Sequence, residues 1–306
     1  MRSSKVIVKM GEAAALITAV SWTAAAMIFE SASSRAGVTA VNTLKVLFGT
    51  VYLSILAYFF SDQIIPSGIP LKSWIFMSAS GVVGFIIGDF FLFNSYLMVG
   101  SRIAMLLMAA SVPMTAVASY FIFGETIGYW GVLGITGTVL GIGITVVSGN
   151  RNSAVNPESG GSDYIKGVVF GILSAVAMAG GTLLTKVGAA DISAIAATQI
   201  RIFAAFAGFV LIVVFFRKTG EVMDALKDFQ SFSLIAAGSV FGPFIGVGAL
   251  LYALQHAEAG IVATISSLTP VLIIAPSIIL LKKRISYAEI AGAFIAVGSV
   301  SLLFMH

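Results

Sequence analysis

Three charged residues stand in stretches of sequence that are otherwise apolar: Lys45, Asp89 and Arg201. A charge at the centre of a bilayer costs roughly 2.5–3.5 kcal/mol on insertion scales, so such residues usually face a cavity or a partner. Lys45 and Arg201 suit an anionic group such as a carboxylate, unless both lie near helix starts and extend to the headgroups. Asp89, which we expect to be the only acid deep in an apolar segment, suits proton coupling or pairing with Lys45. The alternative is a hydrogen-bonded structural acid.

Further polar residues extend this candidate site. Asn42 lies three residues before Lys45 on one helical face, and Tyr96 lies seven residues after Asp89 on another. The predicted substrate-binding residues are Trp22, Asn42, Lys45, Tyr96, Ser111, Arg201, Ser267 and Thr269. For the aromatic and hydroxyl residues the alternative is packing or hydrogen bonding between helices. Because cysteine is absent and histidine occurs twice, we expect neither a metal site nor a cofactor.

Glycines and prolines recur at matching places in the two halves of the chain. The glycine pairs are Gly84 with Gly88 and Gly242 with Gly246, and the prolines are Pro113 and Pro270. Gly-x-x-x-Gly lets two helices approach closely, and a proline inside an apolar helix tends to kink it. The glycines recur after 158 residues, the prolines after 157, and Lys45 recurs as Arg201 after 156. This spacing, which drifts by only two residues, indicates two copies of one unit.

Composition places the chain in a bilayer. Hydrophobic residues make up 58% and charged residues 10% of the sequence, with a mean hydropathy of +1.04. A soluble domain usually has about a quarter of its residues charged. The sequence pI of about 9.3 does not point to nucleic acid, because the cations stand singly at helix edges. Spanning the hydrocarbon takes about 20 residues as a helix. We therefore expect an all-α integral membrane protein with spans near 11–30, 38–60, 73–96, 103–123, 128–148, 166–186, 192–216, 232–255, 259–281 and 286–305.

The ten spans divide into two five-helix repeats, 11–148 and 166–305, joined by a flexible polar linker over 149–165. An odd number of spans per repeat means that the second copy enters the membrane upside down. Inverted repeats are typical of secondary transporters, which bind their substrate near the midplane between the repeats.

The pattern of two five-helix halves, each with a central proline in its fourth helix, resembles the EamA family of the drug/metabolite transporter superfamily. The matching residues are Ser111-Val112-Pro113 followed by Phe123-Gly124-Glu125, and in the second half Ser266-Ser267-Leu268-Thr269-Pro270. The resemblance implies export or exchange of a small metabolite, amino acid or drug across the cell (inner) membrane. It also implies that both termini are cytoplasmic, whereas the loop cations favour the opposite orientation, and both stay open. The family usually closes each half with a glutamate, but the second half here has Lys282-Lys283-Arg284.

These observations favour a secondary transporter that moves a small organic solute by alternating access, with the proton as a candidate coupling ion and no required oligomer. The alternative is an uncoupled facilitator of the same fold. A channel is disfavoured because a single-chain inverted repeat supplies no multi-subunit filter. An intramembrane enzyme is disfavoured because a second span aspartate and well-placed histidines are missing.

Overall fold

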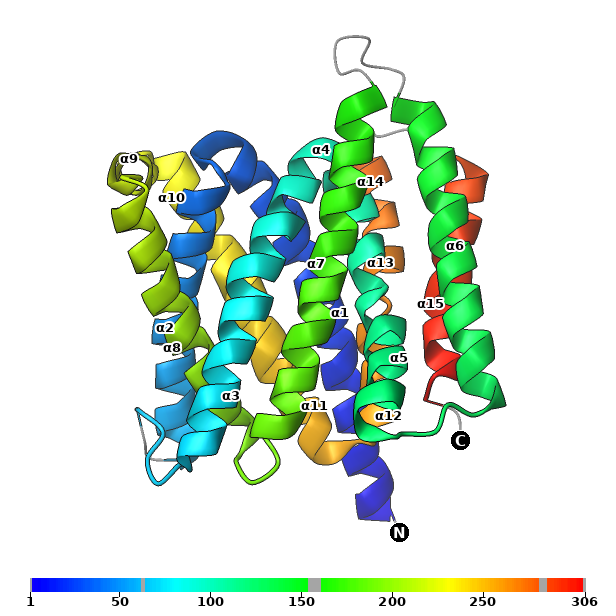
Figure 1. The fold of residues 1–306 in the computed structure, drawn as a ribbon, viewed down its shortest axis with the longest axis horizontal. Helices are drawn as coiled ribbons and strands as arrows, with labels where there is room; N and C mark the ends of the chain where they lie inside the picture. The colour runs from blue at the N-terminus through cyan, green and yellow to red at the C-terminus, as the bar shows by residue number, and fades with distance from the viewer. Residues whose placement is uncertain (1, 62–63, 154–160, 281–284, 305–306) are drawn as a thin grey trace.

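The computed structural model describes residues 2–61, 64–153, 161–280 and 285–304, and every element in these ranges is a helix (Figure 1). The first repeat contains α1 (Arg2–Ala36), α2 (Val38–Ser61), α3 (Leu71–Gly81), η1 (Val82–Gly88), α4 (Asp89–Ala109), α5 (Ser111–Phe123) and α6 (Tyr129–Ser153). The second contains α7 (Gly161–Gly188), α8 (Ala194–Phe215), α9 (Thr219–Lys227), α10 (Phe229–Ser239), η2 (Val240–Gly246), α11 (Val247–His256), α12 (Ala259–Ser266), α13 (Thr269–Leu272), α14 (Ile274–Ile279) and α15 (Tyr287–Leu302).

Apolar helices long enough to cross a bilayer dominate the structure. Among the described residues there are eight such segments, one of which is the 53-residue run Leu71–Phe123. This run contains two predicted spans, because Gly100 has a φ of +81° that glycine adopts readily and that turns the chain back. With α15 as a shorter apolar helix of 16 residues, the segments account for the ten predicted spans.

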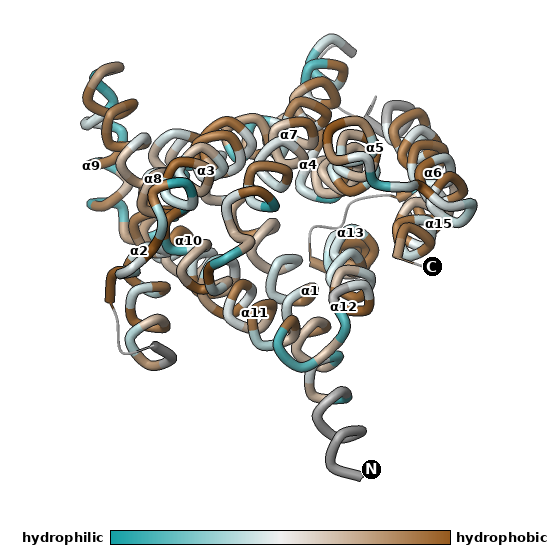
Figure 2. Tube along the Cα trace, turned by 60° about the horizontal axis from the view of Figure 1, so that its bottom comes forward, coloured by the Kyte–Doolittle hydropathy of each residue, from teal (hydrophilic) through white to brown (hydrophobic). Residues whose placement is uncertain are grey.

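The outer surface is apolar, as a lipid-facing surface must be. Large side chains such as Phe121 and Phe215 are 77% and 81% exposed. Figure 2 shows hydrophobic residues along the helices, with hydrophilic ones gathered at α9 and at helix ends. An exposed apolar surface of this extent on a single chain marks contact with lipid.

The two repeats have opposite orientations. In Figure 1, α1 begins and α15 ends at the lower end of the molecule, which we call the termini end. α6 ends and α7 begins at the upper end, which we call the linker end. The predicted fold of two inverted repeats is therefore confirmed. α6 extends to Ser153 and α7 begins at Gly161, so helix continues into the predicted linker, whose residues 154–160 lie outside the described residues. The basic cluster 282–284 also lies outside them.

Reciprocal packing relates the repeats by an approximate two-fold axis. A Cβ at Gly11 of α1 would lie 2.8 Å from the Cβ of Ala257, just after α11. At the equivalent Gly167 of α7 it would lie 2.6 Å from the Cβ of Met98 in α4. The first helix of each repeat thus packs against the third span of the other. Such crossed packing ties the two halves together.

Two π-helices coincide with the repeated glycine pairs. η1 and η2 each contain seven residues and end at Gly88 and Gly246. A Cβ at Gly246 would lie 2.6 Å from the indole of Trp22 in α1, and a Cβ at Gly88 would lie 3.2 Å from the methyl group of Met178, the equivalent of Trp22 in α7. Single-turn π segments are rare and often mark functional positions. Here η1 places Asp89 at the start of α4.

Helix breaks precede both prolines. α4 and α5 are separated at Ala110, three residues before Pro113, and α12 ends at Ser266, before Pro270 in the first turn of α13. A proline donates no backbone hydrogen bond and disfavours helical geometry in the residue before it. The fourth span of each repeat is therefore built from short, angled helices.

Candidate functional site

A buried ion pair joins α2 to α4. The ammonium nitrogen Nζ of Lys45 lies 2.5 Å from the carboxylate oxygen Oδ2 of Asp89, and the two side chains are 11% and 8% exposed. Nζ also lies 4.6 Å from the ring centroid of Phe93 and 5.9 Å from that of Phe29. Electrostatic attraction is strong in such a low-dielectric site, and aromatic faces stabilise the cation further. Asp89 is therefore the partner of Lys45, as one of its three predicted roles has it, and its role in coupling stays a prediction.

A second cation, from the other repeat, lies beside this pair. The guanidinium carbon of Arg201, on α8, lies 4.6 Å from the ring centroid of Phe85 in η1, the π-helix that Asp89 directly follows. Its Nε is buried and has no hydrogen-bond partner among the described residues. Of these two cations, one from each repeat, Lys45 forms the ion pair with Asp89. The cluster of Lys45, Asp89 and Arg201, which we call the charged centre, carries a formal charge of +1.

Two glycines, Gly81 and Gly84, make room for Arg201 beside Phe85. A Cβ at Gly81 would lie 2.2 Å from the backbone oxygen of Arg201, and a Cβ at Gly84 would lie 3.3 Å from its Nη2. Real Cβ atoms do not approach backbone as closely as the first of these distances. Glycine at these positions lets α8 lie against α3 and η1, which brings the guanidinium to the ring of Phe85.

An unpartnered amide lies on the same helix as Lys45. Asn42 is fully buried, and neither its amide nitrogen nor its amide oxygen has a partner among the described residues. A buried polar group left without a hydrogen bond costs roughly 1–3 kcal/mol. The amide therefore offers both donor and acceptor capacity one turn from the charged centre.

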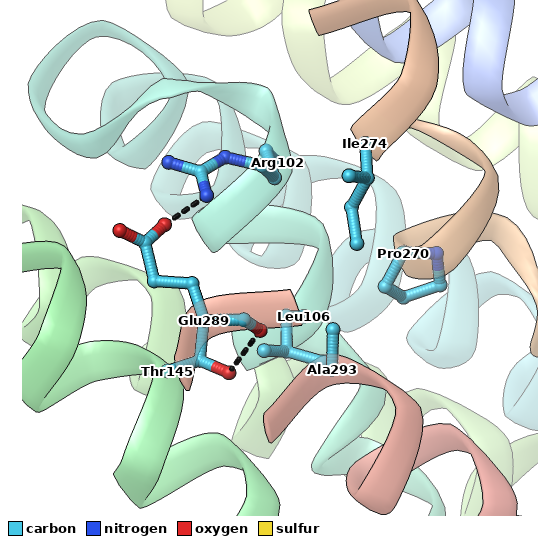
Figure 3. Close-up of a pocket in the computed structure, with 7 residues that line it drawn as sticks. All are labelled: Arg102, Leu106, Thr145, Pro270, Ile274, Glu289 and Ala293. Carbon is cyan, nitrogen blue, oxygen red and sulfur yellow. Dashed lines mark hydrogen bonds and ion pairs between the residues drawn. The ribbon is translucent and has the colours of Figure 1, made fainter. Parts of the chain in front are cut away.

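A second buried ion pair links the repeats. The guanidinium Nη1 of Arg102, on α4, donates to the carboxylate of Glu289 in the first turn of α15, and Figure 3 shows the two side chains pointing toward each other. Their side chains are 13% and 0% exposed. The hydroxyl of Thr145 on α6 donates to the backbone oxygen of Glu289 at 3.3 Å. A cavity of about 10 Å³, the size of one water molecule, lies between these groups and Pro270.

This pair adds a second buried acid, at a helix start, to the predicted Asp89. Glu289 is 1% exposed and lies inside the predicted span 286–305. The sequence contains one signal of its position: Ser286 and Glu289 have the spacing of a helix-capping box, and the Ser286 hydroxyl does accept from the Glu289 backbone N–H at 3.2 Å. That motif predicts a helix start at the membrane edge, whereas the carboxylate is covered by α4 and α6.

The sequence comparisons decide the family. The model of the EamA-like transporter family matches residues 9–147 and 165–305. The chain belongs to this family. The EamA-like chain is therefore a multi-pass membrane protein of the drug/metabolite transporter type. A solved crystal structure, described only as that of a protein, is similar with a TM-score of 0.63 and 17% sequence identity, covering 97% of this chain and 95% of that one. At that identity the likeness shows a shared fold. No curated protein sequence matches the chain.

The remaining predicted site residues of this EamA-like protein lie in other contacts. Tyr96 joins the charged centre indirectly: its ring stacks on Phe93 at 5.2 Å, and its hydroxyl donates to the sulfur of Met105 at 3.1 Å. Trp22 covers Gly246. Ser111 is half-buried at the start of α5.

Hydroxyl groups around the second proline bond to helix carbonyls. The Ser267 hydroxyl donates to Thr264 at 2.7 Å, and the Thr269 hydroxyl donates to Ser266 at 2.9 Å. Thr23 of α1 donates across the repeats to the Thr269 backbone oxygen at 3.4 Å. These bonds connect helices in the way expected of hydroxyl side chains in a membrane interior. Substrate binding by Ser267 and Thr269 stays a prediction.

Proposed function

We propose that this protein is a secondary transporter that exports or exchanges a small organic solute across the cell (inner) membrane by alternating access. The observation that carries the proposal is the charged centre. Two cations and one acid, drawn from both repeats, are buried where an isolated charge would be costly. A cost of that kind is retained where the charges bind something, because well-packed apolar residues would otherwise be at least as stable.

The inverted repeats provide a physical basis for the conformational change that alternating access needs. Each repeat packs its first helix against the third span of the other, so rocking one half against the other exchanges two related arrangements. A site that lies between the halves then opens to one side at a time. Because one chain contains both repeats, the cycle needs no second subunit.

Asp89 is the proposed coupling residue. A proton on its carboxylate would remove the negative charge that holds Lys45, and the released ammonium would change the affinity of the centre for a charged solute. Ligand binding and protonation would then be linked through one side chain, which is the requirement for proton coupling.

The experiment uses everted membrane vesicles. A thermal-shift screen of the purified protein against amino acids, nucleosides, sugars and cationic drugs supplies a labelled solute, since a ligand that binds the native state raises its melting temperature. We expect Asp89→Asn to abolish uptake driven by a pH gradient and to spare exchange of solute for solute. Asp163→Asn, at a 55% exposed side chain, is the matched control and should leave both activities unchanged. Unchanged gradient-driven uptake in Asp89→Asn would remove Asp89 from coupling and favour the uncoupled facilitator.

A further inference from the structure

The charged centre is asymmetric although the framework around it is repeated. Lys45 and Arg201 occupy equivalent positions in the second helix of each repeat, 156 residues apart. Asp89 is the first residue after η1, and the first residue after η2 is Val247. The first repeat thus has an acid at this position for its own cation, whereas the second repeat has its cation and a valine at the equivalent position.

We propose, as an inference that rests on the proposed function, that Arg201 binds the carboxylate of an organic-acid solute. That carboxylate takes the role in the second repeat that Asp89 has in the first. The transported solute is therefore an organic carboxylate.

The surroundings of Arg201 fit this assignment. Val247 packs in the apolar cluster that contains Ile202, the residue after Arg201, and Phe85, whose ring lies beside the guanidinium. An acid at position 247 would therefore lie at the same apolar cluster as Ile202 and Phe85, the two neighbours of Arg201. The Nε of Arg201 has no partner among the described residues. A guanidinium offers donors in a planar fork that matches a carboxylate, and one flank of this fork is buried and unused.

The charge of the centre selects the sign of the solute. Lys45 is neutralised by Asp89 at 2.5 Å, so the excess positive charge belongs to Arg201. An anion at Arg201 would balance this charge, an uncharged solute would leave the formal charge of the three residues at +1, and a cation would raise it to +2. In a low-dielectric site these differences are large, and they favour the anion.

The first test compares carboxylates with their amides. The full-length protein in detergent at pH 7 is heated with acetate, lactate or benzoate, and separately with acetamide, lactamide or benzamide. Carboxylates are ionised at this pH, and each amide has nearly the same shape without the charge. We expect at least one carboxylate to raise the melting temperature and its amide to leave it unchanged. If no carboxylate raises the melting temperature, or if each amide acts as strongly as its acid, the inference is overturned.

The second test introduces an acidic side chain at position 247, the position equivalent to Asp89 in the second repeat. In Val247→Asp the new carboxylate neutralises Arg201, so we expect the response to carboxylates to be lost. Val247→Asn has the same size without the charge and should retain the response. Carboxylate binding in Val247→Asp equal to that of the unmodified protein would refute the inference.

A third pair of variants decides the matter if Val247→Asp does not fold. Arg201→Gln removes the cation and should weaken carboxylate binding by about 30-fold or more, the effect of truncating one partner of a buried charge pair. Arg201→Lys keeps the charge and should retain part of the affinity. Equal binding by both variants would overturn the inference. A solute of another class that is carried by Asp89-dependent uptake would leave the proposed function standing while this inference falls.

Discussion

Replacing Glu289 alone, so that Arg102 keeps its buried charge without a partner, should destabilise the protein strongly. Replacing both residues by apolar ones should not. We consider Glu289→Leu, which exchanges the acid for an apolar side chain of similar size. The Glu289 side chain is fully buried and that of Arg102 is 13% exposed. The variant therefore leaves the guanidinium charged, covered and without its anion.

The size of the effect follows from this burial. Removing one partner of a buried ion pair costs roughly 3–5 kcal/mol. At about 2–4 °C per kcal/mol, the scale for domains of 150–250 residues, the melting temperature should fall by roughly 6–20 °C. Replacing both partners with Glu289→Leu and Arg102→Met removes both desolvated charges and should be neutral or stabilising by about 1–4 kcal/mol.

The assay is thermal unfolding of the purified protein, followed by the fluorescence of its three tryptophans. Lys186 and Glu125 form an ion pair whose side chains are 43% and 50% exposed, and Glu125→Leu is the matched control. An exposed pair of this kind contributes about 0–1 kcal/mol, so the control should change little. A fall in melting temperature no larger for Glu289→Leu than for Glu125→Leu, or a double variant as unstable as the single one, would contradict a buried ion pair between Arg102 and Glu289.

Two further predictions concern packing and pH. A Cβ at Gly141 of α6 would lie 2.4 Å from a backbone nitrogen of α15, so Gly141→Ala should destabilise by about 1–3 kcal/mol. Nothing lies within 4 Å of a Cβ at Gly143, so Gly143→Ala should be neutral or slightly stabilising; equal melting temperatures for the two would contradict the α6–α15 packing. At the membrane edge, hydrogen bonds from Ser231 hold the pKa of Asp228 below its usual value. A lowered pKa gives stability that is present at neutral pH and lost as pH falls through it. The melting-temperature deficit of Asp228→Asn should therefore be seen at pH 7 and shrink in strong acid, and a deficit independent of pH would contradict this assignment.

The spans and the duplication could be predicted from sequence because both are local patterns. A helix that crosses lipid needs a certain apolar length whatever its neighbours are. The 158-residue spacing between Gly84 and Gly242 exists before any folding. Inversion follows from five spans per repeat.

The sequence by itself therefore determined the class of the protein, its ten spans and its two inverted copies, because hydrophobic length and repeat spacing need no knowledge of neighbours. Only the tertiary structure decided which charges meet. Lys45 pairs with an acid 44 residues away, and Arg102 with one 187 residues away. Glu289 lies at a helix start, where solvent is the usual surrounding, and it is buried because helices distant in sequence cover it. Whether a charge is solvated or paired depends on what other helices bring to it, and that is a property of the assembled fold.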